Sequence, residues 1–515
     1  MNICLINPAY AKVRSEGEDY YYSGFTLPHL GLGYIAAYLE KNGYIVDVYE
    51  CMGQDISINE MIEILLKKKY DIIGISIYEG NKKDGFRIIN DLAKTGSKSF
   101  VFAGGYTATL SSEQILRAYP SINCCVLGEG EQTILELVNK LAKEQDYKTT
   151  RGIAYLENGQ YIKTEKQNLI QKLDDLPFPK RVFMNRNRII SMISSRGCNG
   201  NCIFCSIVSL YRNCKGKIYR NRSAQNVVEE IEYLISQYNN IKNICFFDDN
   251  FLENTPENNK KIIDLVALFK EKNLFIPFSI TSCARDIIRM RSVLCDLKSI
   301  GLYSVFIGVE SFVQRQLDFY NKNTTVEENM LAIEIVKDIG LELSLGLIAF
   351  DPYVSLDEVE LNFRSLKRMK VTNSGLTPFS LHTYLIAVRG TTFMNALVNE
   401  KKYVPNQRGY LFESAEVSQV VEYVELWNKA TNQIVSKSYL IESLQDKGDF
   451  QRAKILREIY GRYIDLDIDY IIGLCMAKKS GLSIEDVFNG FYKNYQTIFD
   501  QFMSNSTDAE SITII

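Results

Sequence analysis

Residues 188–208 read RIISMISSRGCNGNCIFCSIV, and this stretch carries the strongest structural signal of the chain. The β-branched run Ile189–Ser194 predicts a strand, and Cys198, Cys202 and Cys205 follow it with the spacing C-x3-C-x2-C. Three thiolates on one short loop can hold three irons of a [4Fe–4S] cluster and leave the fourth iron open. A structural zinc site is the alternative, but zinc takes four protein ligands and the whole chain has only two histidines. The spacing therefore favours a cluster with an open coordination site.

Beyond the cysteines, strands alternate with helical segments such as SAQNVVEEIEYLISQY. Six βα units without antiparallel signals predict a partial βα barrel over residues 186–394. Past residue 395 the strand signals nearly vanish and apolar residues recur at helical spacing, which predicts a helical C-terminal domain, residues 395–515. The barrel strands expected after the first one are Asn243–Asp248, Ile276–Thr281, Tyr303–Val309, Glu342–Ala349 and Gly375–Leu381.

Residues 1–145 show the same alternation, and continuous apolar runs such as DIIGISI indicate strands buried on both faces. We expect a Rossmann-like parallel sheet covered by helices, with ligands at the carboxyl ends of its strands. Residues 146–185 form the expected linker, with a hairpin turn at Asn158-Gly159. The strands expected in the sheet are Ile3–Asn7, Ile45–Glu50, Asp71–Ile77, Ser99–Ala103 and Asn123–Leu127.

Composition narrows the functional class. The 515 residues are 46% hydrophobic and 23% charged, with a formal net charge of -3, which disfavours a general binder of nucleic acid or of anionic membranes. Neither a signal peptide nor an apolar run long enough to cross a bilayer is evident, so we expect a cytoplasmic chain. Twelve cysteines are too dilute for a disulfide scaffold. Ten basic and no acidic residues lie within residues 180–222, and we expect them to hold anionic cofactor groups or to be solvated.

The cysteine triad resembles the signature of the radical S-adenosylmethionine enzymes, which have an aromatic residue before the third cysteine. The resemblance continues through FFDDNF, SCAR and GVES at successive strand ends, and through LIAVRGTTF, where Arg389 replaces the family's proline. It implies that Arg285 pairs with the carboxylate of S-adenosylmethionine. Taken singly, these residues could equally be strand caps or surface charges. The resemblance implies seven residues that contact S-adenosylmethionine at its cluster end, amino group, carboxylate or ribose. They are Phe204, Asp248, Asp249, Asn250, Arg285, Glu310 and Ser311.

Residues 1–145 resemble the cobalamin-binding domain that precedes the barrel in one branch of this superfamily, in TLPHLGLGYIAAYLEKNGYIVDVYE, FVFAGGYTATLSSEQIL and VLGEGEQTILELV. A sheet that binds a nucleotide, or nothing, is the alternative, although no G-x-G-x-x-G follows the first strand. Small residues at strand ends would admit the corrin. The implied contacts are Ser76, Gly104, Gly105 and Thr107, and further along Gly128, Glu129 and Gly130.

Histidines are scarce near this domain. The loop INPAY lacks the histidine that lies beneath cobalt in other cobalamin proteins, so the resemblance implies a lower face without protein imidazole. We expect a structural role for His29. His382, after the last barrel strand, could be a substrate-side catalytic residue or a packed, hydrogen-bonded one.

Together the resemblances imply a cobalamin-dependent radical S-adenosylmethionine enzyme, and among these a methyltransferase acting on an unactivated carbon. In this family a 5′-deoxyadenosyl radical removes a substrate hydrogen, methylcobalamin delivers the methyl group, and an external donor such as flavodoxin or ferredoxin supplies electrons. The substrate would be a small molecule or a peptide.

Three alternatives remain open. A radical cyclase or rearrangement enzyme could use both domains without net methyl transfer. A methylthiotransferase would need a second cluster, but the cysteines of the N-terminal domain do not form a triad. A corrinoid or iron–sulfur binding protein would not turn over at all.

Replacing Cys198, Cys202 or Cys205 by alanine is expected to abolish both the brown cluster absorbance and 5′-deoxyadenosine formation, because each thiolate holds one iron. Absorbance and product chromatography after anaerobic reconstitution measure the two effects. Cys214→Ala is the control, since this nearby cysteine falls outside the regular spacing and should be dispensable. A triad variant that keeps both properties would rule out the radical mechanism.

Overall fold

The computed structural model describes most of the chain and divides it into two compact units. Unit 1 comprises Met1–Thr281, Asp296–Leu302 and Val388–Asn395, and unit 2 comprises Ser282–Cys295, Tyr303–Ala387 and Ala396–Ile515. The described residues are 1–9, 13–15, 18–20, 27–184, 188–370, 381–406, 408–446 and 448–506.

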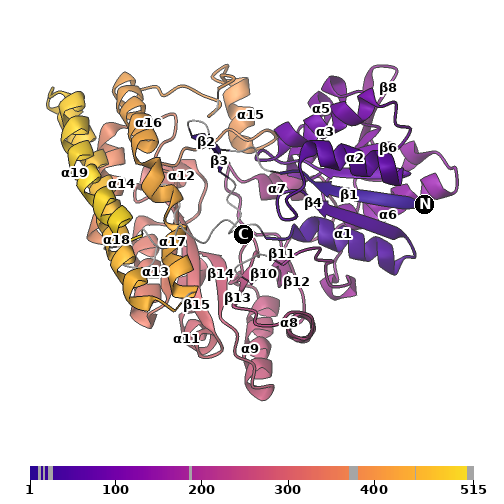
Figure 1. Ribbon diagram of the computed structural model, residues 1–515, viewed down its shortest axis with the longest axis horizontal. Helices are drawn as coiled ribbons and strands as arrows, with labels where there is room; N and C mark the ends of the chain where they lie inside the picture. The colour runs from indigo at the N-terminus through magenta and orange to yellow at the C-terminus, as the bar shows by residue number, and fades with distance from the viewer. Residues whose placement is uncertain are drawn as a thin grey trace. The chain divides into compact units, whose positions relative to one another are not determined.

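Unit 1 begins with a seven-stranded sheet in the order β4-β1-β5-β6-β7-β8-β9 (Figure 1). The first five strands pair in parallel, as continuous apolar runs predict, and the last two are antiparallel. The turn at Asn158-Gly159 has positive φ at both residues, which suits a tight hairpin. The strands are β1 (Asn2–Asn7), β4 (Ile45–Glu50), β5 (Ile72–Ser76), β6 (Phe100–Gly104), β7 (Cys124–Val126), β8 (Ile153–Glu157) and β9 (Gln160–Lys163).

Helices cover both faces of this sheet (Figure 1). One apolar core packs beneath α2, α3 and α5, and the other beneath α1 and α6, so both faces of the strands are removed from water. A separate ribbon pairs β2 (Val13–Ser15) with β3 (Glu18–Tyr20). The helices are α1 (Leu30–Lys41), α2 (Ile58–Lys68), α3 (Lys82–Lys94), α4 (Tyr106–Leu110), α5 (Ser112–Ala118) and α6 (Gly130–Ala142), with short 3-10 turns at Tyr147–Thr149 and Leu173–Asp175.

The second part of unit 1 contains parallel strands β10, β13 and β14, the last of which ends beyond the unit. An antiparallel ribbon of β11 and β12, which the sequence did not indicate, flanks the cysteines. These elements are β10 (Ile189–Met192), β11 (Ser195–Arg196), α7 (Ser206–Tyr211), β12 (Arg220–Asn221), α8 (Ala224–Gln237), β13 (Asn243–Phe246), α9 (Pro256–Glu271) and β14 (Phe278–Cys283).

Unit 2 pairs β15 (Leu302–Glu310) with β16 (Glu342–Leu347) in parallel, and capping boxes begin α13 at Thr325 and α14 at Ser355. The helices of this part of unit 2 are α10 (Ala284–Arg289), α12 (Gln314–Phe319), α13 (Val326–Ile339) and α14 (Leu356–Arg368). Two further helices, α11 (Arg291–Ser299) and α15 (Thr392–Asn399), contain residues of both units.

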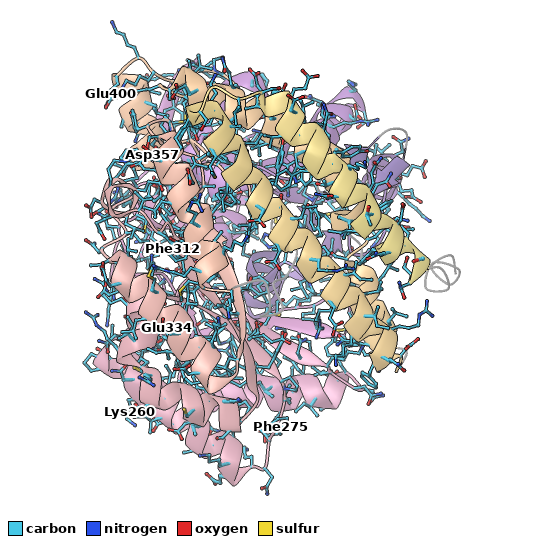
Figure 2. The ribbon with its side chains drawn as sticks, turned by 90° about the vertical axis from the view of Figure 1, so that its left-hand side faces the viewer. Lys260, Phe275, Phe312, Glu334, Asp357 and Glu400 are labelled. Atoms are coloured by element: carbon cyan, nitrogen blue, oxygen red, sulfur yellow. The ribbon has the colours of Figure 1, made fainter. Side chains whose placement is uncertain are left out.

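The C-terminal part of unit 2 is helical, as predicted. Figure 2 shows Asp357 near the first turn of α14, which packs along α18, and Lys479 of α18 pairs with Asp357 at 2.7 Å. Trp427 of α16 is fully buried and stacks on Tyr470 of α18 at 4.3 Å. Of the described helices, none is long and apolar enough to cross a membrane. The C-terminal helices are α16 (Ala415–Ser436), α17 (Tyr439–Asp446), α18 (Phe450–Lys479) and α19 (Ile484–Ser504).

The predicted fold class is confirmed. All five expected strands of the first sheet form, and five of the six expected barrel strands form within a few residues of their predicted bounds. The sixth, Gly375–Leu381, lies outside the described residues except for Leu381. The hairpin placed in the linker instead extends the N-terminal sheet as β8 and β9, because β8 pairs with the edge strand β7.

Candidate functional site

The three cysteines lie on an irregular stretch, residues 197–205, here called the cysteine loop, between β11 and α7. Gly197 begins the loop with a φ of 86°, and a Cβ there would lie 2.3 Å from a backbone oxygen, so only glycine fits. Cys205 is the N-cap residue of α7. All three cysteines are half-buried, as is Phe204, and none of the cysteines forms a disulfide.

The donor set suits an iron–sulfur cluster better than a single metal ion. Within the described parts of the chain, no three His, Cys, Asp or Glu side chains converge closely enough to hold one ion. A [4Fe–4S] cluster places each thiolate on a different iron, so its cysteines need not meet at one point. Burial raises the pKa of the Cys198 thiol to about 12, and bound iron would favour the thiolate.

Acidic residues after β13 hold the cysteine loop. Oδ2 of Asp249 accepts a hydrogen bond from the N–H of Gly197 at 2.8 Å, and Oε1 of Glu253 accepts one from the side-chain amide of Asn199 at 3.1 Å. Asn250 donates to the other oxygen of Glu253 at 2.8 Å. Burial raises the pKa of Asp249 to about 6, although the N–H of Gly197 acts against that rise. Glu253, which sequence reasoning missed, thus shares with Asp249 the task of shaping the loop.

Asp248 anchors the backbone just before the loop. It accepts hydrogen bonds from the N–H of Ser194 at 3.0 Å and from the hydroxyls of Ser194 and Ser195 at 2.7 and 2.5 Å. Buried Lys261 donates to the Ser194 hydroxyl at 2.8 Å, and burial lowers the pKa of this lysine to about 8. Contact of Asp248, Asp249 and Asn250 with S-adenosylmethionine stays a prediction.

In unit 2, Arg285 lies in the first turn of α10, directly after β14. Its Nε atom is buried and has no hydrogen-bond partner among the described residues. A buried, unsatisfied guanidinium nitrogen is costly without a ligand, so this arginine fits an anionic partner such as a carboxylate.

Glu310 ends β15 in a strained conformation. Its φ is 64°, next to a shift in the register between β15 and β16, and non-glycine residues adopt this region mainly where function or packing demands it. Its Oε1 accepts a hydrogen bond from Lys322 at 2.8 Å. Ser311 is fully buried, and its hydroxyl bonds Gln316 at 2.6 Å and Asn362 at 3.0 Å. These contacts give Ser311 a packing role, and its contact with the cofactor stays a prediction.

Four predicted cobalamin contacts meet at one edge of the N-terminal sheet. Ser76 and Gly104 are register partners at the ends of β5 and β6, and Gly105 and Thr107 follow directly. A Cβ on Gly104 would meet only the side chain of Val126, at 4.0 Å, whereas Gly105 needs its φ of 92°. The Oγ1 atom of Thr107 is buried without a described hydrogen-bond partner. The open space at Gly104 and the unsatisfied hydroxyl of Thr107 are the two features at this edge that fit a polar ligand.

The loop after β1 contains no imidazole, and Asn7, the last residue of β1, is fully engaged. Asn7 donates to Glu50 at 2.7 Å and accepts from Tyr78 at 2.9 Å. His29 caps α1: its Nδ1 accepts the N–H of Leu32 at 3.1 Å, so the proton of the neutral ring is on Nε2. Burial lowers the pKa of His29 to about 4, which keeps the ring neutral. The expected structural role of His29 agrees with this geometry.

The next predicted contacts, Gly128, Glu129 and Gly130, follow β7. A Cβ on Gly128 would lie 2.2 Å from the sulfur of Cys214, and one on Gly130 would lie 2.8 Å from Ile35. Close packing therefore explains both glycines, and their contact with cobalamin stays a prediction. Glu129 is paired with two arginines of the basic stretch.

The expectation that this basic stretch is solvated is wrong for four of its arginines, and the alternative that it holds cofactor anions stays a prediction. Arg181 and Arg222 pair with the fully buried Glu230 at 2.8 and 2.5 Å. Arg196 and Arg220 pair with Glu129. Glu230 is only eight residues from Arg222, but it is 49 residues from Arg181, and Glu129 is 67 and 91 residues from Arg196 and Arg220, where a local reading of charge could not find it.

His382 is a packed residue. Its Nδ1 lies 2.6 Å from Oδ1 of Asn428 on α16, and its Nε2 lies 3.1 Å from Asp467 on α18. Asp467 also accepts a hydrogen bond from the indole of Trp427 at 2.7 Å. Burial acts to lower the pKa of His382, but Asp467 outweighs it and raises that pKa. The geometry supports the packed alternative over the catalytic one.

Comparisons with known proteins agree with both halves of the site. A family model described as the B12 binding domain matches residues 22–138, and one described as the Radical SAM superfamily matches residues 192–366. The chain therefore combines a B12-binding domain with a domain of the radical S-adenosylmethionine superfamily. These two domains imply three cofactors, which are cobalamin, a [4Fe–4S] cluster and S-adenosylmethionine.

Individual relatives are distant. A protein named as an uncharacterized methyltransferase of Pyrococcus horikoshii is 28% identical over 82% of this chain and 89% of its own length. The anaerobic magnesium-protoporphyrin IX monomethyl ester cyclase of Rubrivivax gelatinosus is 29% identical over 66% of this chain, which spans 61% of that relative. The solved structure of the cobalamin-dependent radical enzyme OxsB, with aqua-cobalamin and S-adenosylmethionine bound, has a TM-score of 0.76 at 21% identity, covering 100% of this chain and 81% of that one. That structure supports the fold.

Arg285→Ala should weaken S-adenosylmethionine binding by about 1.5–3 kcal/mol, the usual loss for a hydrogen bond to a charged group, without changing the iron content. Equilibrium binding to the reconstituted protein measures the loss. Arg289→Ala is the matched control, because Arg289 lies on the same helix with half of its side chain exposed. Equal affinities in the two variants would place the carboxylate elsewhere.

Cobalamin bound in its Co(II) state should give an electron paramagnetic resonance spectrum without nitrogen superhyperfine splitting from a lower ligand. His29→Asn, which can still cap α1, should leave that spectrum unchanged. Gly104→Leu should block loading by filling the open space, whereas Gly490→Leu, at an exposed helical position with no neighbour near its Cβ, should load normally. If the wild-type spectrum shows nitrogen splitting that is absent in His29→Asn, then a ring nitrogen of His29 binds cobalt. That result would contradict the tautomer assigned to His29, in which Nε2 carries the proton.

Proposed function

We propose that this enzyme is a methyltransferase that places a methyl group on an unactivated carbon of a small molecule or peptide. The observation that carries the proposal is that one chain combines a cysteine loop suited to a cluster with a sheet edge that has open space at Gly104 and a buried Thr107 hydroxyl without a described hydrogen-bond partner. A relative that aligns over most of both chains is named as an uncharacterized methyltransferase, which supports methyl transfer as the class of reaction.

The cofactors supply the chemistry and the protein supplies their positions. When bound, the cluster and S-adenosylmethionine provide a carbon radical that removes a substrate hydrogen, and cobalamin provides the methyl group. Cys198, Cys202 and Cys205 would hold three irons, on a loop that Asp249 and Glu253 shape through Gly197 and Asn199.

Two binding groups remain for the cofactors' polar ends. The guanidinium of Arg285 would pair with the carboxylate of S-adenosylmethionine, which satisfies its buried Nε. The Thr107 hydroxyl would donate to an oxygen of cobalamin. The Nε2–H of His29 lies 3.4 Å from the hydroxyl oxygen of Ser76 and helps to orient it toward the same edge.

The reducing electron would come from an external one-electron donor such as flavodoxin or ferredoxin, because the chain has no second cysteine triad. This partner, and the cytoplasmic location expected from the sequence, are predictions.

A radical cyclase that uses the same cofactors is the second candidate. It is supported by the relative named as an anaerobic cyclase, which aligns over 66% of this chain. The two functions differ in one product: methyl transfer converts S-adenosylmethionine to S-adenosylhomocysteine, and cyclisation through the radical alone does not.

Anaerobic protein reconstituted with cluster and cobalamin, then reduced and given S-adenosylmethionine, should form S-adenosylhomocysteine even without substrate, because reduced cobalamin accepts a methyl group. Methyl-labelled S-adenosylmethionine and chromatography measure the product. Gly104→Leu, which should not load cobalamin, is the control and should form none. Only 5′-deoxyadenosine would favour the cyclase, and neither product would favour a binding protein without turnover.

A further inference from the structure

Four buried charges lie between the predicted cobalamin edge and the cysteine loop. Glu129 follows β7, Glu131 lies in the first turn of α6, Arg196 is on β11 and Arg220 is on β12. The exposed fractions of these four side chains are between 2% and 11%. We call Glu129, Glu131, Arg196 and Arg220 the four-charge cluster.

The contacts within this cluster are close and mutual. Arg196 bonds Glu131 at 2.7 Å and Glu129 at 3.3 Å, and Nη1 of Arg220 donates to Oε2 of Glu129 at 2.9 Å. Burial acts to raise the pKa of Glu129, but the guanidinium groups of Arg196 and Arg220 outweigh it and lower that pKa. Two carboxylates and two guanidinium groups thus balance in charge.

Both ends of the cluster are fixed to a functional loop. Arg196 directly precedes Gly197, where a Cβ would lie 2.3 Å from the backbone oxygen of Ile218, and it pairs across the ribbon with Arg220. On the other side, Glu129 is flanked by Gly128 and Gly130, which pack tightly against Cys214 and Ile35. Displacing either loop would separate charges that are largely removed from water, and an uncompensated buried charge is strongly unfavourable.

We propose that the four-charge cluster couples the two cofactor sites, so that an ordered cysteine loop strengthens cobalamin binding and bound cobalamin stabilises the cluster-loaded loop. In this role Arg196 is a positioning residue, and Glu129 acts through its ion pairs with Arg196 and Arg220, separately from the cobalamin contact predicted for it. The reciprocity follows from thermodynamic linkage. The inference rests on the proposed function only for cobalamin and cluster binding, and it does not require methyl transfer.

The test compares the dissociation constant of hydroxocobalamin for the full-length protein with and without a reconstituted cluster. Wild type should bind about fivefold or more tightly when the cluster is present, the lower range of measured allosteric coupling. Arg196→Lys keeps the charge but loses the forked contact to two carboxylates, and Glu129→Gln keeps the shape but loses the charge, so in both the ratio should fall toward one. A residue that only stabilised the fold would change both dissociation constants and leave their ratio intact.

Arg151→Lys is the matched control, because Arg151 pairs with Glu136 of α6 outside the four-charge cluster and is half exposed. If the single variants fail to fold, Arg196→Met combined with Glu131→Gln removes one charge of each sign and leaves Glu129 paired with Arg220. In that double variant, the ratio of the two hydroxocobalamin dissociation constants should also fall toward one.

The outcomes separate the two proposals. A wild-type ratio of one, or an unchanged ratio in the cluster variants, overturns the coupling even if S-adenosylhomocysteine forms. A coupled ratio without S-adenosylhomocysteine leaves the coupling intact and overturns the methyltransferase. A protein that binds no cobalamin in either state overturns both.

Discussion

The cysteine loop contains no helix or strand, so its shape depends on hydrogen bonds from outside it. Asp249 accepts the N–H of Gly197, and Glu253 accepts the amide of Asn199. Three thiolates can bind three irons only if the backbone between them is held, because each thiolate must reach its own iron. The loop after β13 therefore holds the cysteine loop in position, although none of its residues is a predicted ligand of the cluster.

A buried ion pair connects the cysteine loop to the N-terminal sheet. Arg196 adjoins the cysteine loop and Glu129 adjoins the predicted cobalamin edge, and their pairing links the two. A buried ion pair adds little net stability against a well-packed apolar pair, but breaking one is costly. Such pairs therefore suit a structure that must hold two loops in register.

Unit 2 uses polar burial in a different way. His382, Asn428 and Asp467 join the segment after β16 to α16 and α18 through one hydrogen-bonded network. Arg285 retains an unsatisfied buried nitrogen, and Glu310 retains a strained backbone. Fully satisfied groups hold helices together, whereas unsatisfied or strained ones mark where a ligand would compensate.

The sequence by itself determined the fold class, the positions of most strands along the chain and the cysteine triad, since hydrophobic period and ligand spacing are local properties of the chain. It also placed Ser76, Gly104 and Thr107 at one sheet edge, because parallel strands end together. Tertiary structure decided which charges meet. Glu129 and Arg196 are 67 residues apart in the sequence, and the basic stretch looked solvated until folding brought Glu230, Glu129 and Glu131 against its arginines. Glu253, the tautomer of His29 and the packing of His382 were likewise beyond local pattern, because each depends on a partner that only the folded chain supplies.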